Sequence, residues 1–385
     1  MKHLIYLNKF IWKYRNLLFI GCIFIIIANL FALYPAEFVR KAFDAVLLSI
    51  NEGTEKDIKI HYTILKYGGL IVSFAILKGV FMFFMRQTII VMSRKIEFDL
   101  KNEIYKQYQS LSMSFYKKNK TGDLMNRISE DVSRVRMYLG PVLMYGINII
   151  ILFYLVISKM LSISIPLTLY VLIPLPILAI LVYYVSSNIN KRSEKVQEQL
   201  SQITAISQES FSGIRIIKSF GHELNTWKVF LKSCRDYTSR QIQLVKIEAM
   251  FFPLIVTMIG TSTIFTIYIG GIESFKGNIT TGNIAEFIIY INMLAWPVAS
   301  VGWITSIIQR AAASQERIND FLQKKSSIKN TTNIATPING DIKFKNVSLI
   351  YNDTNILALK KVTFTIREGS CIGIFGKTGS GKSTI

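Results

Sequence analysis

The residues with the clearest chemical potential form a glycine-rich segment, GKTGSGKST, at residues 376–384. The segment fits the pattern G-x-x-x-x-G-K-[ST], in which glycines allow backbone N–H groups to close around phosphate groups. In this pattern the lysine, here Lys382, reaches the terminal phosphates. The sequence therefore predicts a phosphate-binding loop.

Such a loop lies between a strand and a helix, and the residues before it have the composition of strands. Apolar runs predict strands at residues 342–349, 362–366 and 371–375, the last of which ends directly on the loop. Residues 323–340 are polar, with Pro337 and Gly340, and predict a linker. We therefore expect residues 341–385 to be the N-terminal β-strand stub of a P-loop α/β ATPase domain, truncated at the loop.

The rest of the chain is too apolar for a soluble protein. Hydrophobic residues make up 51% of it and the mean hydropathy is positive. The net charge of +21 fits nucleic acid, an anionic membrane surface or basic cytoplasmic loops, and the positions of the charges must decide between them. The three cysteines, Cys22, Cys234 and Cys371, lack metal-ligand spacing and are expected to be reduced.

Six stretches reach the length of about 20 apolar residues that crosses a bilayer. They are residues 17–36, 64–84, 137–157, 163–185, 249–271 and 284–307. Lys and Arg are abundant in the two long loops, residues 86–136 and 186–248, and rare in the two short loops. This distribution places the long loops and both termini in the cytoplasm. Of the three explanations of the positive net charge, it favours basic cytoplasmic loops. The first outer loop disagrees, because it contains Arg40, Lys41, Lys56 and Lys59.

Apolar residues recur at helical spacing in both long loops, as at Ile96, Leu100 and Ile104, so the spans should continue into the cytoplasm as helices. Turn-rich segments at residues 111–136 and 212–223 are the expected tips. Residues 1–16 mix apolar and basic side chains, as in a helix that lies in the membrane interface.

Two features of the spans have more than one interpretation. Lys78 lies well inside the second span, where it either faces a wet cavity or extends toward the interface. Five residues of the sixth span share a helix face that could line a cavity for bulky amphipathic solutes or simply pack: Ile289, Met293, Trp296, Ser300 and Trp303. No cluster of histidine, cysteine or carboxylate predicts a hydrolytic or metal site.

The whole chain resembles the ABC exporters, in which six spans are fused to a nucleotide-binding domain. The segments FYKKNKTGDLMNRISEDVSRVR and SGIRIIKSFGHE are similar to the two coupling regions of that family. TTGNIAEFIIYINMLAWPVAS and QRAAASQERINDFL resemble its sixth span and exit helix. The resemblance is greatest to bacterial multidrug-type half-transporters. It implies a transmembrane domain at residues 17–322 after an interfacial elbow helix at residues 1–16, and thus a mostly α-helical polytopic membrane protein.

The resemblance also implies the cofactors ATP and Mg²⁺, with an aromatic residue stacked on adenine. The residues at the corresponding positions are Tyr351, Gly376, Gly379, Gly381, Lys382, Ser383 and Thr384, with Ser383 on Mg²⁺. The catalytic carboxylate and the switch histidine of the family have no counterpart, so we expect no catalytic residue and no ATP hydrolysis by this chain alone.

The partners implied by the resemblance are a second half-transporter, identical or different, the lipid bilayer, and a small-molecule or lipid solute, without nucleic acid. The expected location is the bacterial plasma membrane, with both termini cytoplasmic. The alternative function is a non-enzymatic membrane module that pairs with a complete ABC partner. The sequence leaves the transported solute open.

Overall fold

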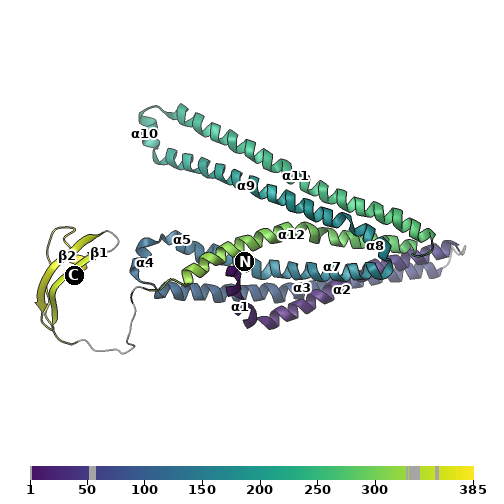
Figure 1. The fold of residues 1–385 in the computed structure, drawn as a ribbon, viewed down its shortest axis with the longest axis horizontal. Coiled ribbons are helices and arrows are strands. Elements are labelled where there is room, and N and C mark those ends of the chain that lie inside the picture. Colours follow the sequence, from purple (N-terminus) through teal and green to yellow (C-terminus); the bar gives the residue numbers. More distant parts are fainter. Residues whose placement is uncertain (1, 52–57, 327, 329–338, 352–354) are drawn as a thin grey trace. The chain divides into compact units, whose positions relative to one another are not determined.

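The computed structural model describes residues 2–51, 58–326, 328, 339–351 and 355–385. It divides into a helical unit, Met1–Ser327, and a smaller unit, Ile328–Ile385 (Figure 1). Most of the expected linker lies outside the described residues, as does the tip of the first outer loop with Lys56.

The helical unit consists of long helices joined by short ones. In chain order they are a 3-10 helix (Lys2–Leu7), α1 (Asn8–Lys13), α2 (Arg15–Asn51), α3 (Ile58–Ser110), α4 (Met113–Lys118), α5 (Thr121–Asn126), the π-helix η2 (Arg127–Asp131), α6 (Val132–Met137), the π-helix η3 (Tyr138–Val142), α7 (Leu143–Ile163), α8 (Ile165–Leu172), α9 (Pro174–Ser212), α10 (Ile214–Ser219), α11 (Glu223–Phe275) and α12 (Thr281–Leu322).

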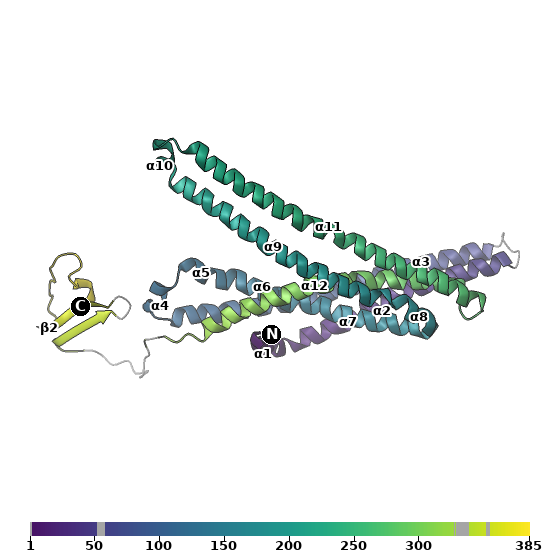
Figure 2. The same cartoon turned by 45° about the horizontal axis from the view of Figure 1, so that its top comes forward.

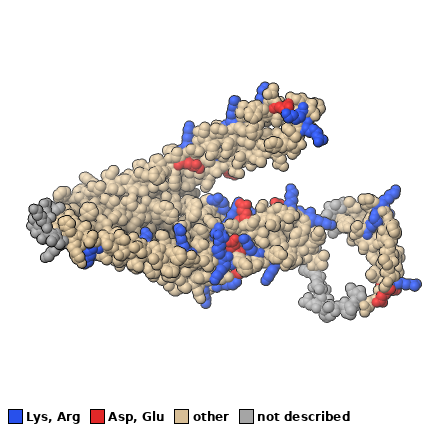
Figure 3. All heavy atoms as spheres, turned by 180° about the vertical axis from the view of Figure 1, so that it is seen from behind, with Lys and Arg blue, Asp and Glu red and all other residues tan. Residues whose placement is uncertain are grey.

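Six helical stretches among the described residues are long and apolar enough to cross a membrane, which confirms the six predicted spans. Helices α3 and α11 have 53 residues each. At 1.5 Å per residue each is about 80 Å long, whereas the hydrocarbon core of a bilayer is about 30 Å thick. These helices therefore extend far beyond the lipid, as the helical spacing of Ile96, Leu100 and Ile104 predicted. Figure 3 shows Lys and Arg gathered toward one end of this unit, beside a broad band with few charges.

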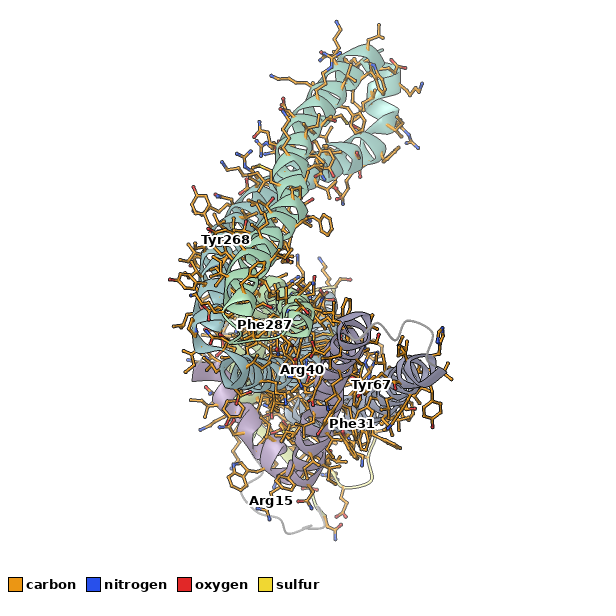
Figure 4. The ribbon with its side chains drawn as sticks, turned by 90° about the vertical axis from the view of Figure 1, so that its right-hand side faces the viewer. Arg15, Phe31, Arg40, Tyr67, Tyr268 and Phe287 are labelled. Carbon is orange, nitrogen blue, oxygen red and sulfur yellow. The ribbon has the colours of Figure 1, made fainter. Side chains whose placement is uncertain are left out.

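The helices pack through two apolar clusters. One joins the N-terminal segment to α3, α6 and the end of α12, and includes the fully buried Ile96, Leu100 and Ile104. The other joins α2, α7, α8, α9 and the beginning of α12 around Phe287. Aromatic pairs also hold α2 against α3, as where the rings of Phe31 and Phe74 lie 5.5 Å apart. In Figure 4, Phe287 lies inside the bundle, and Phe31 lies in the part of the bundle that α2 and α3 form.

Helices α9 and α11 lie side by side and diverge from the other helices toward α10 (Figures 1 and 2). A buried hydrogen bond of 3.0 Å from Nε2 of Gln199 to Oγ of Ser233 joins the two helices. The pair begins after a chain reversal at Ser164, whose side chain accepts the N–H of Leu167 at the start of α8. We call α9, α10 and α11 the arm.

The segment between α5 and α7 includes two π-helical stretches, η2 and η3. In η3, Gly140 lies against the buried Ser93 of α3, and a Cβ atom at Gly140 would lie 2.6 Å from Ser93 Oγ. Only glycine allows this approach of the two helices. Extra residues per turn of this kind occur frequently at functional sites.

The smaller unit contains an antiparallel pair of strands, β1 (Ile342–Tyr351) and β2 (Ile356–Ile366), in which Phe344 opposes Phe364. Both strands are longer than predicted. The prediction of a strand at residues 371–375 is wrong, since this segment is irregular and the ring of Phe375 is almost fully exposed. A strand before a P-loop depends on neighbouring strands at both edges, and the described part of this unit contains only the β1–β2 pair.

The close contact at Gly140 predicts a stability difference between two glycines. Gly140→Ala should lower the free energy of unfolding by about 1–3 kcal/mol, because the new methyl group overpacks against Ser93. Gly146→Ala is the matched control: it lies in α7 with no neighbouring atom within 4 Å of the position that its methyl group would take, and alanine favours a helix by up to about 1 kcal/mol. Thermal unfolding in detergent measures both. Equal melting temperatures for the two variants would contradict the packing of α3 on η3.

Candidate nucleotide loop and transport path

The loop at residues 376–384 has a conformation that depends on glycine. Gly379 and Gly381 have φ angles of +82° and +85°, in the left-handed region that side chains disfavour. A Cβ atom on Gly381 would also lie 2.4 Å from the carbonyl oxygen of Ala358 in β2. A Cβ atom on Gly376 would lie 2.7 Å from Ser380 Oγ. Gly379 and Gly381 thus need glycine for their backbone conformation, whereas at Gly376 only the side chain of Ser380 would have to move.

Lys382 bends back over the loop. Its Nζ donates to the carbonyl oxygen of Gly376 at 2.5 Å and to that of Lys377 at 2.8 Å. An ammonium group has three N–H donors, so the loop uses two and leaves one for a ligand. Ser383 is exposed in the 3-10 turn η4 (Lys382–Thr384), where its hydroxyl is accessible.

The structure brings Tyr351 to the loop. The tyrosine ends β1, and its hydroxyl lies 3.1 Å from Thr384 Oγ1. The end of the loop therefore lies beside both strands, with Thr384 next to Tyr351 of β1 and Gly381 next to Ala358 of β2. An ammonium, two hydroxyls and glycines with left-handed backbone fit a phosphate and a magnesium ion in chemical type. The last three residues of the loop, Lys382–Thr384, form a 3-10 turn.

Two cavities flank the crossing of α9 and α12. Their volumes are about 310 and 340 Å³, and both include Ser186, Asn190, Gly302 and Ser306 in their lining. At the crossing, a Cβ atom on Gly302 would lie 2.7 Å from Ser186 Oγ, so glycine allows the helices to approach.

The lining of these cavities combines three kinds of side chain. Besides the shared polar residues it includes aromatic rings and charged groups, namely Tyr183, Phe251, Trp303, Lys191, Glu194 and Glu248. Apolar and aromatic walls with a few polar groups are typical of sites for small molecules. The combination suits solutes that carry both an apolar body and a polar group.

The predicted face of the sixth span is divided in the structure. Trp296 and Trp303 of α12 are exposed, and the ring of Tyr145 in α7 contacts both at 5.5 and 5.9 Å. Ser300 is buried and donates to the carbonyl oxygen of Pro297. Met293 packs against the apolar cluster around Phe287. Ser300 and Met293 therefore pack, whereas the two tryptophans are accessible, and a role of this face in solute binding stays a prediction.

Both predicted tips contain a short helix. The first predicted tip, residues 111–136, contains α4, α5, η2 and most of α6, and the second, residues 212–223, contains α10. We call residues 111–131 the first tip and residues 213–222 the second tip. The apolar side chains of Ile216 and Phe220 in the second tip are exposed, with 66% and 74% of their surfaces accessible. Charged tips with exposed apolar side chains are suited to contact another protein surface.

Other residues singled out from the sequence have ordinary surroundings. Lys78 is half-buried, with no hydrogen-bond or ion-pair partner among the described residues. His222 is exposed just before α11. The three cysteines are free, and the described residues include no cluster of three or more His, Cys, Asp or Glu side chains that could hold a metal ion.

Sequence reasoning missed a polar cluster at the beginning of α12. The carboxylate of Glu286 is fully buried, accepts the hydroxyl of Tyr290 at 2.7 Å, and has its second oxygen 3.4 Å from Nε of Arg40 in α2. That second oxygen accepts no hydrogen bond from the described residues. An acidic residue inside the apolar sequence of the sixth span was the signal that could have revealed this cluster.

A second set of contacts joins the same ends of α2 and α12. Asp44 of α2 accepts the backbone N–H of Gly282 at 3.1 Å and the hydroxyl of Thr280 at 3.0 Å. A carboxylate is favourable at the N-terminus of a helix.

Glu37 pairs with Lys41 and with Lys159 of α7. Arg40 and Lys41, two of the cations that disagreed with the charge rule, are therefore neutralised by nearby acids.

Removal of Arg40 should be costly, because it leaves the buried Glu286 carboxylate without its cation. We expect Arg40→Met to lower the free energy of unfolding by on the order of 3 kcal/mol. The double variant R40M/E286Q should recover most of that loss, since it removes the charge as well. Lys41→Met is the control, because its side chain is 42% exposed and such pairs contribute about 0–1 kcal/mol. Thermal unfolding of the four proteins decides, and a loss in the double variant as large as in R40M would contradict the ion pair.

Comparison with known proteins supports the same conclusion as the geometry. Residues 18–298 match the family described as ABC transporter transmembrane region. The chain is 32% identical over 316 residues to the uncharacterized ABC transporter ATP-binding protein YknU of Bacillus subtilis. This match covers 80% of this chain and 53% of that protein. It is also 32% identical over 383 residues to the multidrug resistance-like ATP-binding protein MdlA of Buchnera aphidicola subsp. Baizongia pistaciae, covering 98% of this chain and 64% of that protein.

A more distant relative is the ATP-dependent lipid A-core flippase of Pseudomonas fluorescens, 26% identical over 74% of this chain and 47% of the flippase. The chain thus spans between about half and two thirds of the length of these curated relatives. The match to the membrane region agrees with the six long apolar helices of the structure. The chain is a multi-pass membrane protein that belongs to the ABC transporter transmembrane region family.

Proposed function

We propose that this chain is a subunit of an ATP-driven ABC exporter that moves lipophilic or amphipathic solutes across the bacterial plasma membrane. The observation that carries the proposal is the presence, in one chain, of a six-span membrane region and of a glycine-dependent loop with Lys382 folded over it. A permease served by a separate ATPase would not need the loop. The names of the relatives, multidrug resistance-like protein and lipid A-core flippase, agree with an exporter of apolar solutes.

In the assembled transporter, ATP would supply the free energy that moves the helices between two states. Lys382 would bind the terminal phosphates with its remaining N–H, and Ser383 would provide a hydroxyl ligand for Mg²⁺. Tyr351, now beside Thr384, would contact the adenine ring. Gly376 would begin the loop, and Gly379 and Gly381 would keep it open to the phosphates, since side chains at these two positions would be strained.

The two cavities beside α9 and α12 are our candidate for the solute site. Trp303 and Phe251 provide apolar contact, while Asn190 and Ser306 provide hydrogen bonds. Apolar contacts discriminate weakly between solutes of similar size. A broad range of amphipathic solutes, including lipids, is therefore expected.

A second half-transporter is the proposed partner. The arm diverges from the other helices, and apolar residues on the part beyond the predicted spans are exposed, among them Leu224 and Trp227 at 76% and 58%. Apolar side chains on a water-facing segment indicate a surface that another protein covers. The proposed orientation puts both tips and both termini in the cytoplasm, because the two long basic loops form the tips.

The proposal predicts that Lys382→Met abolishes ATP-driven transport. Loss of a charged donor to phosphate costs about 1.5–3 kcal/mol, so the affinity for ATP should fall by on the order of 10–100-fold. The measurements are titration with a fluorescent ATP analogue and solute uptake into inverted vesicles that hold the assembled transporter.

Lys377→Met is the matched control for this experiment. Lys377 lies in the same loop, but it is the backbone carbonyl, and not the side chain, that contacts Lys382. This variant should retain both ATP binding and transport. Transport that persists in Lys382→Met, or that is equally lost in both variants, would sink the proposal that Lys382 binds the nucleotide.

A further inference from the structure

The last turns of α12 are attached to the first tip by an ion pair. Nε of Arg317 donates to Oδ2 of Asp131 at 3.1 Å, and Nη2 of Arg317 donates to the other carboxylate oxygen. Nη2 also donates to the hydroxyl of Ser314 one turn earlier in α12. The guanidinium group thus binds the carboxylate with two parallel N–H groups, which fixes their relative orientation.

The two partners are unequally buried. The Asp131 side chain is only 8% exposed, whereas that of Arg317 is 48% exposed. The hydrogen bond to Asp131 raises the pKa of the Arg317 guanidinium above its ordinary value, despite the opposing effect of partial burial. Asp131 ends the π-helix η2, so the pair fixes an irregular part of the helix that leaves the first tip.

Aromatic residues surround this ion pair. Phe321 of α12 is 1% exposed, and its ring lies 4.6 Å from that of Tyr108 in α3 and 6.0 Å from that of Phe115 in α4. The guanidinium of Arg127 in η2 lies over the ring of Phe321 at 5.3 Å. Two segments of the first tip, α4 and η2, and the end of α3 therefore contact one side chain of α12.

The end of α3 is also attached to the end of α12. Nε2 of Gln107, near the end of α3, donates to the carbonyl oxygen of Lys324, just after α12. The second tip is attached differently, because α10 packs against α9 and α11 of the arm. Within the described residues, the two tips thus belong to different sets of helices.

We propose that the Asp131–Arg317 pair is a positioning link that makes the first tip move together with the end of α12. This inference rests on the proposed function, because the chain continues from α12 toward the residues of the nucleotide loop. Packing of Phe321 holds the two elements together, and the bidentate ion pair fixes the rotation of α12 relative to η2. Displacement of the end of α12 then displaces the first tip by the same amount.

Distance measurement between spin labels tests the link directly. In a full-length chain whose Cys22, Cys234 and Cys371 are replaced by alanine, labels are placed at K117C in α4 and A313C in α12, both at exposed positions. In lipid nanodiscs, the two labels should give a single narrow distance distribution when the Asp131–Arg317 ion pair is intact. Asp131→Asn should at least double its width, because the amide cannot accept two N–H groups from Arg317 in the same way.

Glu130→Gln is the matched control. Glu130 is the neighbouring carboxylate and pairs with Arg134, but it is 58% exposed, so its loss should leave the distribution narrow. If Asp131→Asn fails to fold, Arg317→Lys replaces it, since lysine keeps the charge and loses the fork. A distribution as narrow in D131N or R317K as in E130Q would overturn the link.

A transport measurement separates positioning from simple stability. In the assembled transporter, Asp131→Asn should lower the amount of solute moved per ATP hydrolysed by several-fold while hydrolysis continues, and Glu130→Gln should change neither. A broadened distance distribution with an unchanged ratio would overturn the positioning role. If the native protein shows no ATP-dependent transport, the proposed function fails, and the spin-label distances still decide whether the link exists.

Discussion

The need to satisfy every backbone hydrogen bond within lipid determines most of this structure. An unpaired N–H or C=O in the hydrocarbon costs several kcal/mol, so the chain crosses as helices whose hydrogen bonds are internal. Helices α2, α11 and α12 accordingly remain continuous through Pro35, Pro253 and Pro297. The same continuity extends α3 and α11 past the lipid, so that they hold both tips well away from the membrane.

Helix α12 connects the separate parts of the helical unit. Its beginning is joined to α2 through Glu286 and Arg40, and its end is joined to the first tip through Arg317 and Asp131. Between these ion pairs lies Gly302, where α12 crosses α9 beside the two cavities. A rotation or shift of α12 would therefore change the ends of the bundle and the cavity lining together.

The sequence predicted what depends on local periodicity. Apolar length located the six spans, and the spacing of Ile96, Leu100 and Ile104 showed that a helix continues and which face it buries. The glycines of the loop were found because a known backbone conformation needs them at a fixed spacing.

Contacts between residues far apart in the chain could not be predicted in this way. Arg40 was read as a disagreement with the charge rule, because its partner Glu286 lies in another span. Asp131 and Arg317 were part of motifs similar to a family, yet nothing in their spacing indicates that they meet. The error at residues 371–375 has a related cause, since a strand depends on neighbours that local sequence does not specify.

The central claim is that single unbroken helices pass from the lipid into water and support the tips. Collision rates of nitroxide labels placed one at a time along α3 test this claim most directly. Labels at Val72, Ile76 and Val80, which are exposed on the apolar part of the helix, should collide with oxygen and be protected from a water-soluble nickel complex. Labels at Lys101 and Tyr105 should instead collide with the nickel complex. The change from oxygen accessibility to nickel accessibility should fall between residues 84 and 94. Nickel accessibility at all five positions would contradict the account, because it would place the whole of α3 in water.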